Sequence, residues 1–223
     1  MGAVDRSNRG IVPKVHREPA NSTAVAMQNI VLFGGTFDPP HIGHLLMAQL
    51  ALEQTRSDAV WFLPAPAPPH KLNEEHTRHE TRVRLVQALV EGYQAFKVCD
   101  IERSLPTPSY TVDTIHALST MYPNHHFQFL CGSDSLANLP HWHRANELVQ
   151  MIEFVVAVRT GYPFEETLTE VQRELPALRA TVLEMPIVDV SSTFLRERLR
   201  RNLPICGLIP PAVLQVWLEC GTT

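Results

Sequence analysis

Short apolar runs alternate with amphipathic segments from Asn29 onward, and this alternation constrains the fold more than any other feature of the sequence. The runs are short and rich in β-branched and aromatic residues, which is typical of strands buried in a parallel sheet. We predict strands at residues 30–33, 59–63, 96–101, 127–131, 153–159 and 180–185. The segments between and after them predict helices at residues 41–54, 81–90, 111–122, 164–175, 191–201 and 211–219. Residues 64–79 are rich in proline and polar side chains and predict a long loop.

Strands and helices in this order predict an α/β fold, with one doubly wound parallel sheet and helices on both of its faces. The 223 residues, 44% of them hydrophobic, suit a single domain. We assign that domain to residues 27–223 and expect residues 1–26 to be a disordered extension. These are polar, are interrupted by Pro13 and Pro19, and lack the apolar core of a secretory signal. Ligands of such sheets bind where the strand order reverses, at the carboxyl ends of the strands.

The net charge of −4, without a long block of like charge, gives no support for a nucleic-acid partner. The apolar stretches are too short to span a membrane. The cysteines have no C-x-x-C pair, so we predict reduced core thiols in a cytoplasmic protein rather than disulfides or zinc ligands. They are Cys99, Cys131, Cys206 and Cys220. The sequence leaves the oligomeric state open, and a homo-oligomer is compatible with it.

The first strand leads into the segment GGTFDPPHIGHL, which starts at Gly34 and ends at Leu45. Glycines let a ligand approach the backbone closely, and the two prolines delay the start of the helix. His41 and His44 then share one face at the helix N-terminus, where free N–H groups favour anions. This pattern predicts a site for phosphate oxygens, although paired histidines on a helix often face only solvent. A metal site would need a third ligand, and none occurs at suitable spacing. The segment is neither a Walker A nor a G-x-G-x-x-G motif.

As a whole, this segment resembles the H-x-G-H signature of the nucleotidylyltransferase superfamily. That resemblance implies a Rossmann-like domain that binds ATP as its co-substrate, together with Mg²⁺. It also implies that His41 and His44 bind the ATP phosphates and stabilise charge at the α-phosphate. The ATP site would then include Gly34, Gly35, Thr36, Phe37, His41 and His44.

A second motif, VSSTFLRERL, follows the last predicted strand. Ser191 suits a helix cap, and Arg196 lies one turn further on, where its guanidinium can grip a phosphate. Taken alone, the segment is equally typical of a capped surface helix. Beside the first motif it is similar to the S-S-T-x-x-R of bacterial nicotinate mononucleotide adenylyltransferases. The resemblance implies that Ser191, Ser192, Thr193 and Arg196 bind ATP, with Arg196 catalytic beside the two histidines.

Three further segments resemble the same family. PAPAPPHK ends at Lys71, which the resemblance brings near phosphate. In the segment ERSLPTPSYTVDTI, the backbone near Tyr110 and Thr111 would meet the pyridine carboxylate, and Ser109 or Thr111 suits a helix cap. GSDSLANLPHWHR would contribute Gly132 and Asp134 to the ATP site and stack Trp142 on the nicotinate ring. The substrate contacts predicted in this way are Lys71, Ser109, Tyr110, Thr111 and Trp142.

The function implied is transfer of AMP from ATP to nicotinate mononucleotide, which gives nicotinate adenine dinucleotide and pyrophosphate in NAD biosynthesis. The rival substrates are nicotinamide mononucleotide and phosphopantetheine. A rival of another class is a non-catalytic nucleotide sensor, which would tolerate the loss of His41, His44 or Arg196, yet all three are present. A tRNA-ligating fragment would need a basic surface and an anticodon module, and the chain has neither.

Overall fold

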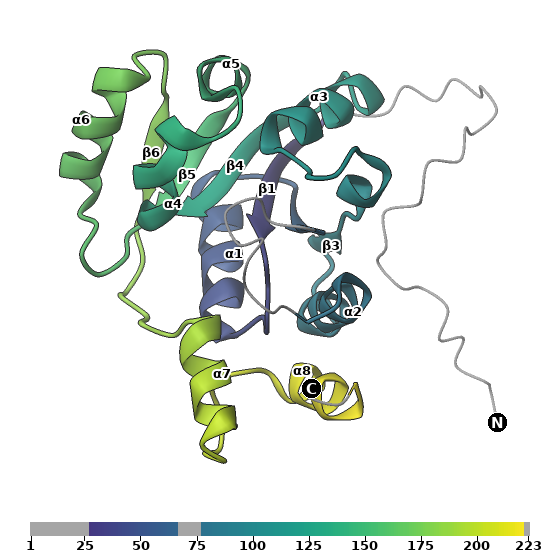
Figure 1. The fold of residues 1–223 in the computed structure, drawn as a ribbon. Helices are drawn as coiled ribbons and strands as arrows, with labels where there is room; N and C mark the ends of the chain where they lie inside the picture. Colours follow the sequence, from purple (N-terminus) through teal and green to yellow (C-terminus); the bar gives the residue numbers. More distant parts are fainter. Residues whose placement is uncertain (1–26, 67–76, 221–223) are drawn as a thin grey trace, which may run out of the picture.

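Six parallel strands form the centre of the molecule, and helices cover both faces of the sheet (Figure 1). This is a computed structural model, which describes residues 27–66 and 77–220. The strands are β1 Asn29–Gly35, β2 Ala59–Pro64, β3 Phe96–Val98, β4 His126–Gly132, β5 Glu153–Ala157 and β6 Ala180–Leu183. The α-helices are α1 Ile42–Gln54, α2 His79–Val90, α3 Thr111–Met121, α4 Ser133–Asn138, α5 Ala145–Met151, α6 Phe164–Glu174, α7 Ser192–Arg200 and α8 Pro211–Glu219. Short 3₁₀ turns are η2 Ile101–Ser104 and η3 Leu139–His141.

The strand order is β3-β2-β1-β4-β5-β6, so the chain builds outward from β1 on one side and then returns to build outward on the other. The reversal lies between β1 and β4, which pair in parallel from Asn29 opposite His126 to Phe33 opposite Leu130. Both strands end at glycines and are followed directly by predicted ligand-binding segments. The α/β prediction is therefore confirmed, and the topology opens a crevice where ligands of such sheets bind.

Alternating side chains of β1 divide the core into two layers, as the period of a strand requires. Ile30 and Leu32 pack with the apolar faces of α3, α4, α5 and α6. Val31 and Phe33 pack on the other face with α1, α2, α7 and α8. The sheet is thus buried on both sides, which explains why its strands read as continuous apolar runs rather than alternating ones.

Several predicted boundaries differ from the structure. The third, fifth and sixth strands end two or three residues early; Ile101, for example, belongs to a 3₁₀ turn. The helices α4 and α5 were not predicted, because each is only six or seven residues long and Pro140 separates them. The predicted extension 1–26 and most of the predicted loop lie outside the described residues. No helix in the described part of the chain is long and apolar enough to cross a membrane.

The cysteine prediction is half right. All four thiols are free, and Cys99 and Cys131 are buried in the core. Burial raises the pKa of the Cys99 thiol to about 11, so this thiol stays protonated. Cys206 is exposed, however, and Cys220 is partly exposed, so the prediction of core thiols is wrong for these two. Both lie in the C-terminal segments around α8, where Ile205 and Trp217 supply buried apolar side chains and the cysteines lie nearer the surface.

Candidate active site

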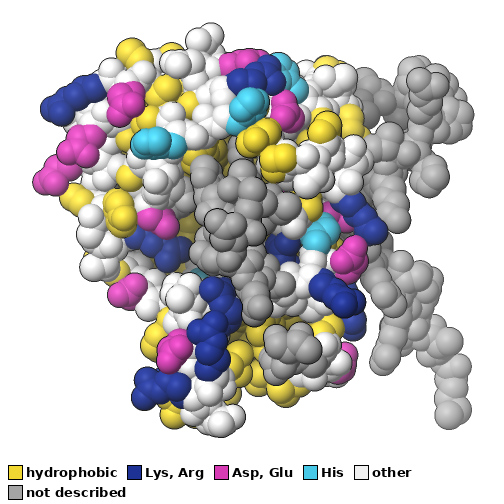
Figure 2. Space-filling view, in the orientation of Figure 1, with side chains coloured by type: hydrophobic (Ala, Val, Ile, Leu, Met, Phe, Trp, Pro, Cys, Tyr) yellow, Lys and Arg dark blue, Asp and Glu magenta, His cyan; other side chains and the backbone are white. Residues whose placement is uncertain are grey.

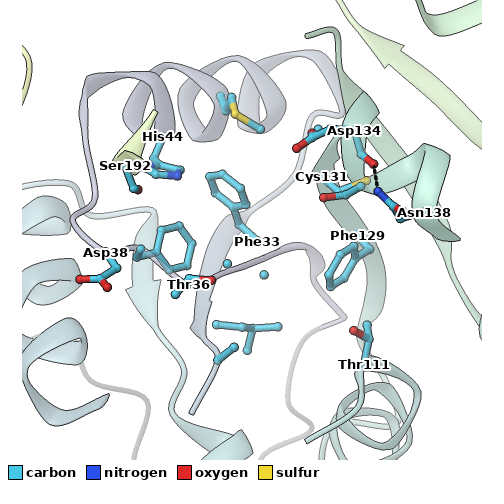
Figure 3. A pocket seen from close by; sticks show the side chains of 18 of the residues that line it. Phe33, Thr36, Asp38, His44, Thr111, Phe129, Cys131, Asp134, Asn138 and Ser192 are labelled. Carbon is cyan, nitrogen blue, oxygen red and sulfur yellow. Dashed lines mark hydrogen bonds between the residues drawn. The ribbon is translucent and has the colours of Figure 1, made fainter. Parts of the chain in front are cut away.

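A cavity of about 780 Å³ lies at the carboxyl ends of β1 and β4 (Figure 3). His44 and Ser192 stand together at one end of it, whereas Thr111 and Phe129 lie at the other. Every predicted site residue in the described part of the chain lines this cavity. These residues are Gly34, Gly35, Thr36, Phe37, His41, His44, Ser109, Tyr110, Thr111, Gly132, Asp134, Trp142, Ser191, Ser192, Thr193 and Arg196. Lys71 lies outside the described residues.

The two histidines of the first loop lie with their rings in contact at the start of α1. His41 immediately precedes the helix, and its backbone N–H donates to Nδ1 of His44 at 3.1 Å. The Nδ1 atom of His44 therefore carries no proton, and in the neutral ring the proton sits on Nε2. The ring centroids of the two imidazoles are 3.7 Å apart. One nitrogen of His44 thus fixes the ring, which leaves Nε2–H as the donor for a ligand.

The helix begins at Ile42 and not at His41, and its first N–H is already occupied. Ile42 donates to the carbonyl of Leu208 at 3.2 Å, so this donor is not free for phosphate as the sequence suggested. Gly43 leaves room for the ring of His41. A Cβ atom at Gly43 would lie 3.0 Å from Nδ1 of His41, so any larger residue would push this ring away.

Both imidazoles are neutral at physiological pH. Burial, with a smaller contribution from the charge of Arg159, lowers the pKa of His41 from 6.5 to about 3. Burial also holds the pKa of His44 well below its usual range, and the charges of His41 and Arg159 act in the same direction. The pair therefore offers neutral N–H donors in the free protein. His41 Nδ1 is buried and has no hydrogen-bond partner among the described residues.

These depressed pKa values predict that acid destabilises the fold. A histidine with a lowered pKa binds fewer protons when folded than when unfolded, so stability is complete above 6.5 and falls as the pH drops below it. Each such histidine contributes at most about 1.4 kcal/mol for every pH unit. Glu102 acts in the opposite sense between 6 and 4.5, because burial raises its pKa to about 6.

Urea unfolding at pH 7, 6 and 5 measures this effect. We expect the free energy of unfolding to fall toward pH 5 in the wild type and to fall less steeply in His41→Asn, which cannot titrate. His126→Asn is the matched control, since His126 is exposed at the opposite end of β4. Equal pH slopes for the wild type and His41→Asn would contradict the assignment.

The second motif contacts the first motif directly, although the two are far apart in the sequence. Ser191 caps α7 as predicted, because its Oγ accepts from the N–H of Phe194 at 3.1 Å. Ser192 Oγ donates to the carbonyl of Pro39 at 2.9 Å. Arg196 Nη1 donates to the carbonyl of Asp38 at 2.7 Å, across 158 residues of sequence. These contacts bring the N-terminus of α7 and the guanidinium of Arg196 beside the two histidines, in the arrangement that a polyphosphate requires.

The loop before α3 is held by a buried carboxylate that sequence reasoning did not select. Glu102 Oε1 accepts from Thr114 Oγ1 at 2.9 Å, and Ser109 Oγ donates to Oε2 at 3.5 Å. The predicted cap by Ser109 or Thr111 is therefore wrong. Tyr110 is the residue before the helix and, among the described residues, makes no side-chain cap hydrogen bond. The first N–H groups of α3 are thus presented at the cavity beside Thr111.

Aromatic rings line the end of the cavity that contains Thr111. Trp142 packs edge-on against Phe129, with ring centroids 6.0 Å apart, and both line the cavity. Tyr110 stacks on His143 at 4.1 Å between centroids. Aromatic rings thus line this end of the cavity, whereas the two histidines and Arg196 line the other.

The sequence analysis did not select two arginines of the site, because only their burial and their contacts show their importance. Arg159 lies 3.8 Å from Asp134 and lines the cavity. Arg82, on α2, is fully buried and donates to three backbone carbonyls, those of Thr36, Pro66 and Thr77. It thereby ties the first loop to two other segments. Its signal in the sequence is only a charged residue on the apolar face of a helix.

Comparisons with known proteins give the family and the relatives of this chain. A family model described as cytidylyltransferase-like matches residues 32–198. A protein of Exiguobacterium sibiricum named "Probable nicotinate-nucleotide adenylyltransferase" is 47% identical over 84% of this chain and 94% of its own. A Bacillus subtilis protein named "Nicotinate-nucleotide adenylyltransferase" is 40% identical over 87% of this chain and 98% of its own.

A solved structure shares the fold. Plasmodium falciparum nicotinic acid mononucleotide adenylyltransferase, complexed with NaAD, superposes with a TM-score of 0.72. The alignment covers 86% of this chain and 96% of the other, at 17% sequence identity.

Proposed function

This chain belongs to the cytidylyltransferase-like family, among the nicotinate-nucleotide adenylyltransferases, and from that premise we propose that its cavity joins ATP to nicotinate mononucleotide. The products are nicotinate adenine dinucleotide and pyrophosphate, in NAD biosynthesis. One observation carries the proposal: the H-x-G-H and S-S-T-x-x-R segments, far apart in sequence, converge on one cavity whose other end is lined by aromatic rings.

The reaction is attack by the 5′-phosphate of nicotinate mononucleotide on the α-phosphorus of ATP, in line with the departing pyrophosphate. The nucleophile is an anion at neutral pH, so no general base is required. Catalysis then rests on positioning and on donors aimed at the transition-state charge. Nε2–H of His44, His41 and the guanidinium of Arg196 supply those donors. Figure 2 shows further basic side chains along α7, which favour the approach of polyanions.

A magnesium ion would accompany ATP into this site. Among the described residues no cluster of three His, Cys, Asp or Glu side chains forms a protein metal site. Magnesium bound with nucleotides is usually held mainly by phosphate oxygens and water. Bound in this way, the ion neutralises phosphate charge. Asp134 lines the cavity, and we assign it, with Gly132, to the ATP subsite.

The nicotinate ring occupies the aromatic end. Trp142 stacks on it, and the backbone at the start of α3, near Tyr110 and Thr111, receives its carboxylate with Ser109 beside it. Helix N-terminal N–H groups favour a carboxylate over a neutral amide. Lys71, which lies outside the described residues, stays assigned to phosphate by sequence alone. The free cysteines suit the reducing cytoplasm, where we expect the protein to act.

Pyrophosphate release from MgATP tests the function, with nicotinate and nicotinamide mononucleotides supplied in parallel. We expect kcat/KM to be higher for the acid by at least tenfold, because the amide leaves the N-terminal donors of α3 without an anion. Phosphopantetheine is the control for the wrong branch of the superfamily. Equal use of acid and amide would support the adenylyl transfer but contradict the proposed carboxylate subsite. Turnover with none of the three would leave a nucleotide-binding sensor.

A further inference from the structure

The turn that carries Trp142 and His143 is tied to α3 by an ion pair of Arg144 with Asp113. Arg144 follows these two residues directly and is the last residue before α5, in the left-handed backbone region with φ of 53°. Its Nη1 donates to Asp113 Oδ1 at 3.0 Å, and Asp113 lies in the first turn of α3. Arg144 thus joins the two segments that line the aromatic end of the cavity, which are 31 residues apart.

Glu147, which is itself held by His116, fixes the guanidinium in this position. Nε and Nη2 of Arg144 donate to the two carboxylate oxygens of Glu147 at 2.8 Å and 2.7 Å, a bidentate geometry. His116, on α3, contacts Glu147 Oε1 at 2.6 Å. The hydrogen bonds from His116 and Arg144 lower the pKa of Glu147, so its carboxylate stays ionised. Figure 2 shows basic, acidic and histidine side chains gathered where α3 and α5 lie side by side.

The same two segments also meet through their rings. Tyr110 precedes Thr111 at the start of α3, and it stacks on His143. All three residues line the cavity together with Trp142. The relative position of the Trp142 turn and α3 therefore sets the width of this end of the cavity, and the ion pair and the ring stack both control that position.

We propose that Arg144 is a positioning residue for the pyridine subsite, holding the Trp142 turn against the first turn of α3. The inference rests on the proposed function. It says that residues outside the two phosphate motifs position the pyridine end of the site. Arg144 touches neither substrate. Its loss widens the aromatic end and leaves the histidine end unchanged, because that end is built by α1 and α7.

Steady-state kinetics of Arg144→Asn test this role, since asparagine tolerates the left-handed backbone while removing the guanidinium. We expect KM for nicotinate mononucleotide to rise about 3- to 10-fold and KM for ATP to stay within about twofold; a change of this size is what an exposed, bidentate ion-pair network supports. Asp113→Asn should raise the same KM. The double variant should be no worse than the poorer single one, because each substitution already removes the contact between Arg144 and Asp113. Arg144→Lys should recover part of the loss.

Arg179→Ala is the matched control. Its exposed side chain pairs with Glu153 at 3.1 Å, at the amino ends of the strands and away from the cavity. A merely structural role would lower the melting temperature in the Arg144 and Arg179 variants alike and leave both KM values unchanged. That outcome, or an equal rise of both KM values in Arg144→Asn, would overturn the proposal. Wild-type turnover with nicotinate mononucleotide is measured in the same assay, so failure of the proposed function shows there and not in the variants.

Discussion

His44→Ala is expected to lower kcat by roughly 10²–10³, the usual cost of removing one donor aimed at developing charge. The ring is fixed through Nδ1 by the backbone N–H of His41, so its Nε2–H is the group presented to ATP. The fold should survive, because His44 lies at the cavity wall and only part of its surface is buried. Single-turnover formation of the dinucleotide measures the loss, and near-normal turnover would remove His44 from the catalytic set.

The substitutions His44→Gln and His44→Asn distinguish the roles of the two ring nitrogens of His44. The amide of glutamine reaches the position of Nε2 and should recover part of kcat. Asparagine places its oxygen near Nδ1, so it preserves the contact to His41 and should remain as slow as alanine. The reverse order would mean that His44 acts by shaping the start of α1 and not by donating to phosphate. His126→Ala, exposed at the far end of β4, controls for the loss of a histidine as such.

Arg196→Ala should lose a comparable factor, about 10²–10³ in kcat, because it removes the charged donor of the second motif. The substitution also removes the hydrogen bond to the carbonyl of Asp38, so the first loop loses one of its ties to α7, while the bond from Ser192 to Pro39 remains. The kcat of Arg196→Lys should lie between those of the wild type and Arg196→Ala. A lysine keeps the charge, but it cannot contact Asp38 and a phosphate at once as the forked guanidinium can.

Exposed Arg201, at the end of the same helix, is the matched control for Arg196. Arg201→Ala should retain kcat within about twofold, because a surface charge contributes little to stability or to a distant site. Urea unfolding of both variants separates a catalytic loss from a loss of fold. An Arg196→Ala variant as active as Arg201→Ala would assign the second motif a structural role only.

The sheet could be predicted from the sequence because burial on both faces leaves a plain mark, a continuous apolar run. Each predicted strand exists, and their errors lie at the ends, where pairing and not composition decides the last residue. The helices α4 and α5 left no such mark, since each makes less than two turns and covers the sheet with only a few apolar side chains.

The site could be predicted only where its residues form compact local motifs. His41 and His44 sit three residues apart, and Ser191 to Arg196 span six, so their meaning is visible in a short window. Glu102, Arg82 and Arg159 carry no such pattern. A buried carboxylate or guanidinium is significant only because of the carbonyls and hydroxyls around it, and these come from distant segments.

The hydrogen bond between Arg196 and Asp38 also sets an order of events during synthesis. The six strands are complete by Leu183, whereas Arg196 and its helix follow them. A ribosome adds about 5–20 residues per second, so the roughly 158 residues between the partners take about 8 to 30 s to emerge. For that interval the nascent chain has only half of its phosphate-binding segments, and a chain cut short before α7 never gains the other half.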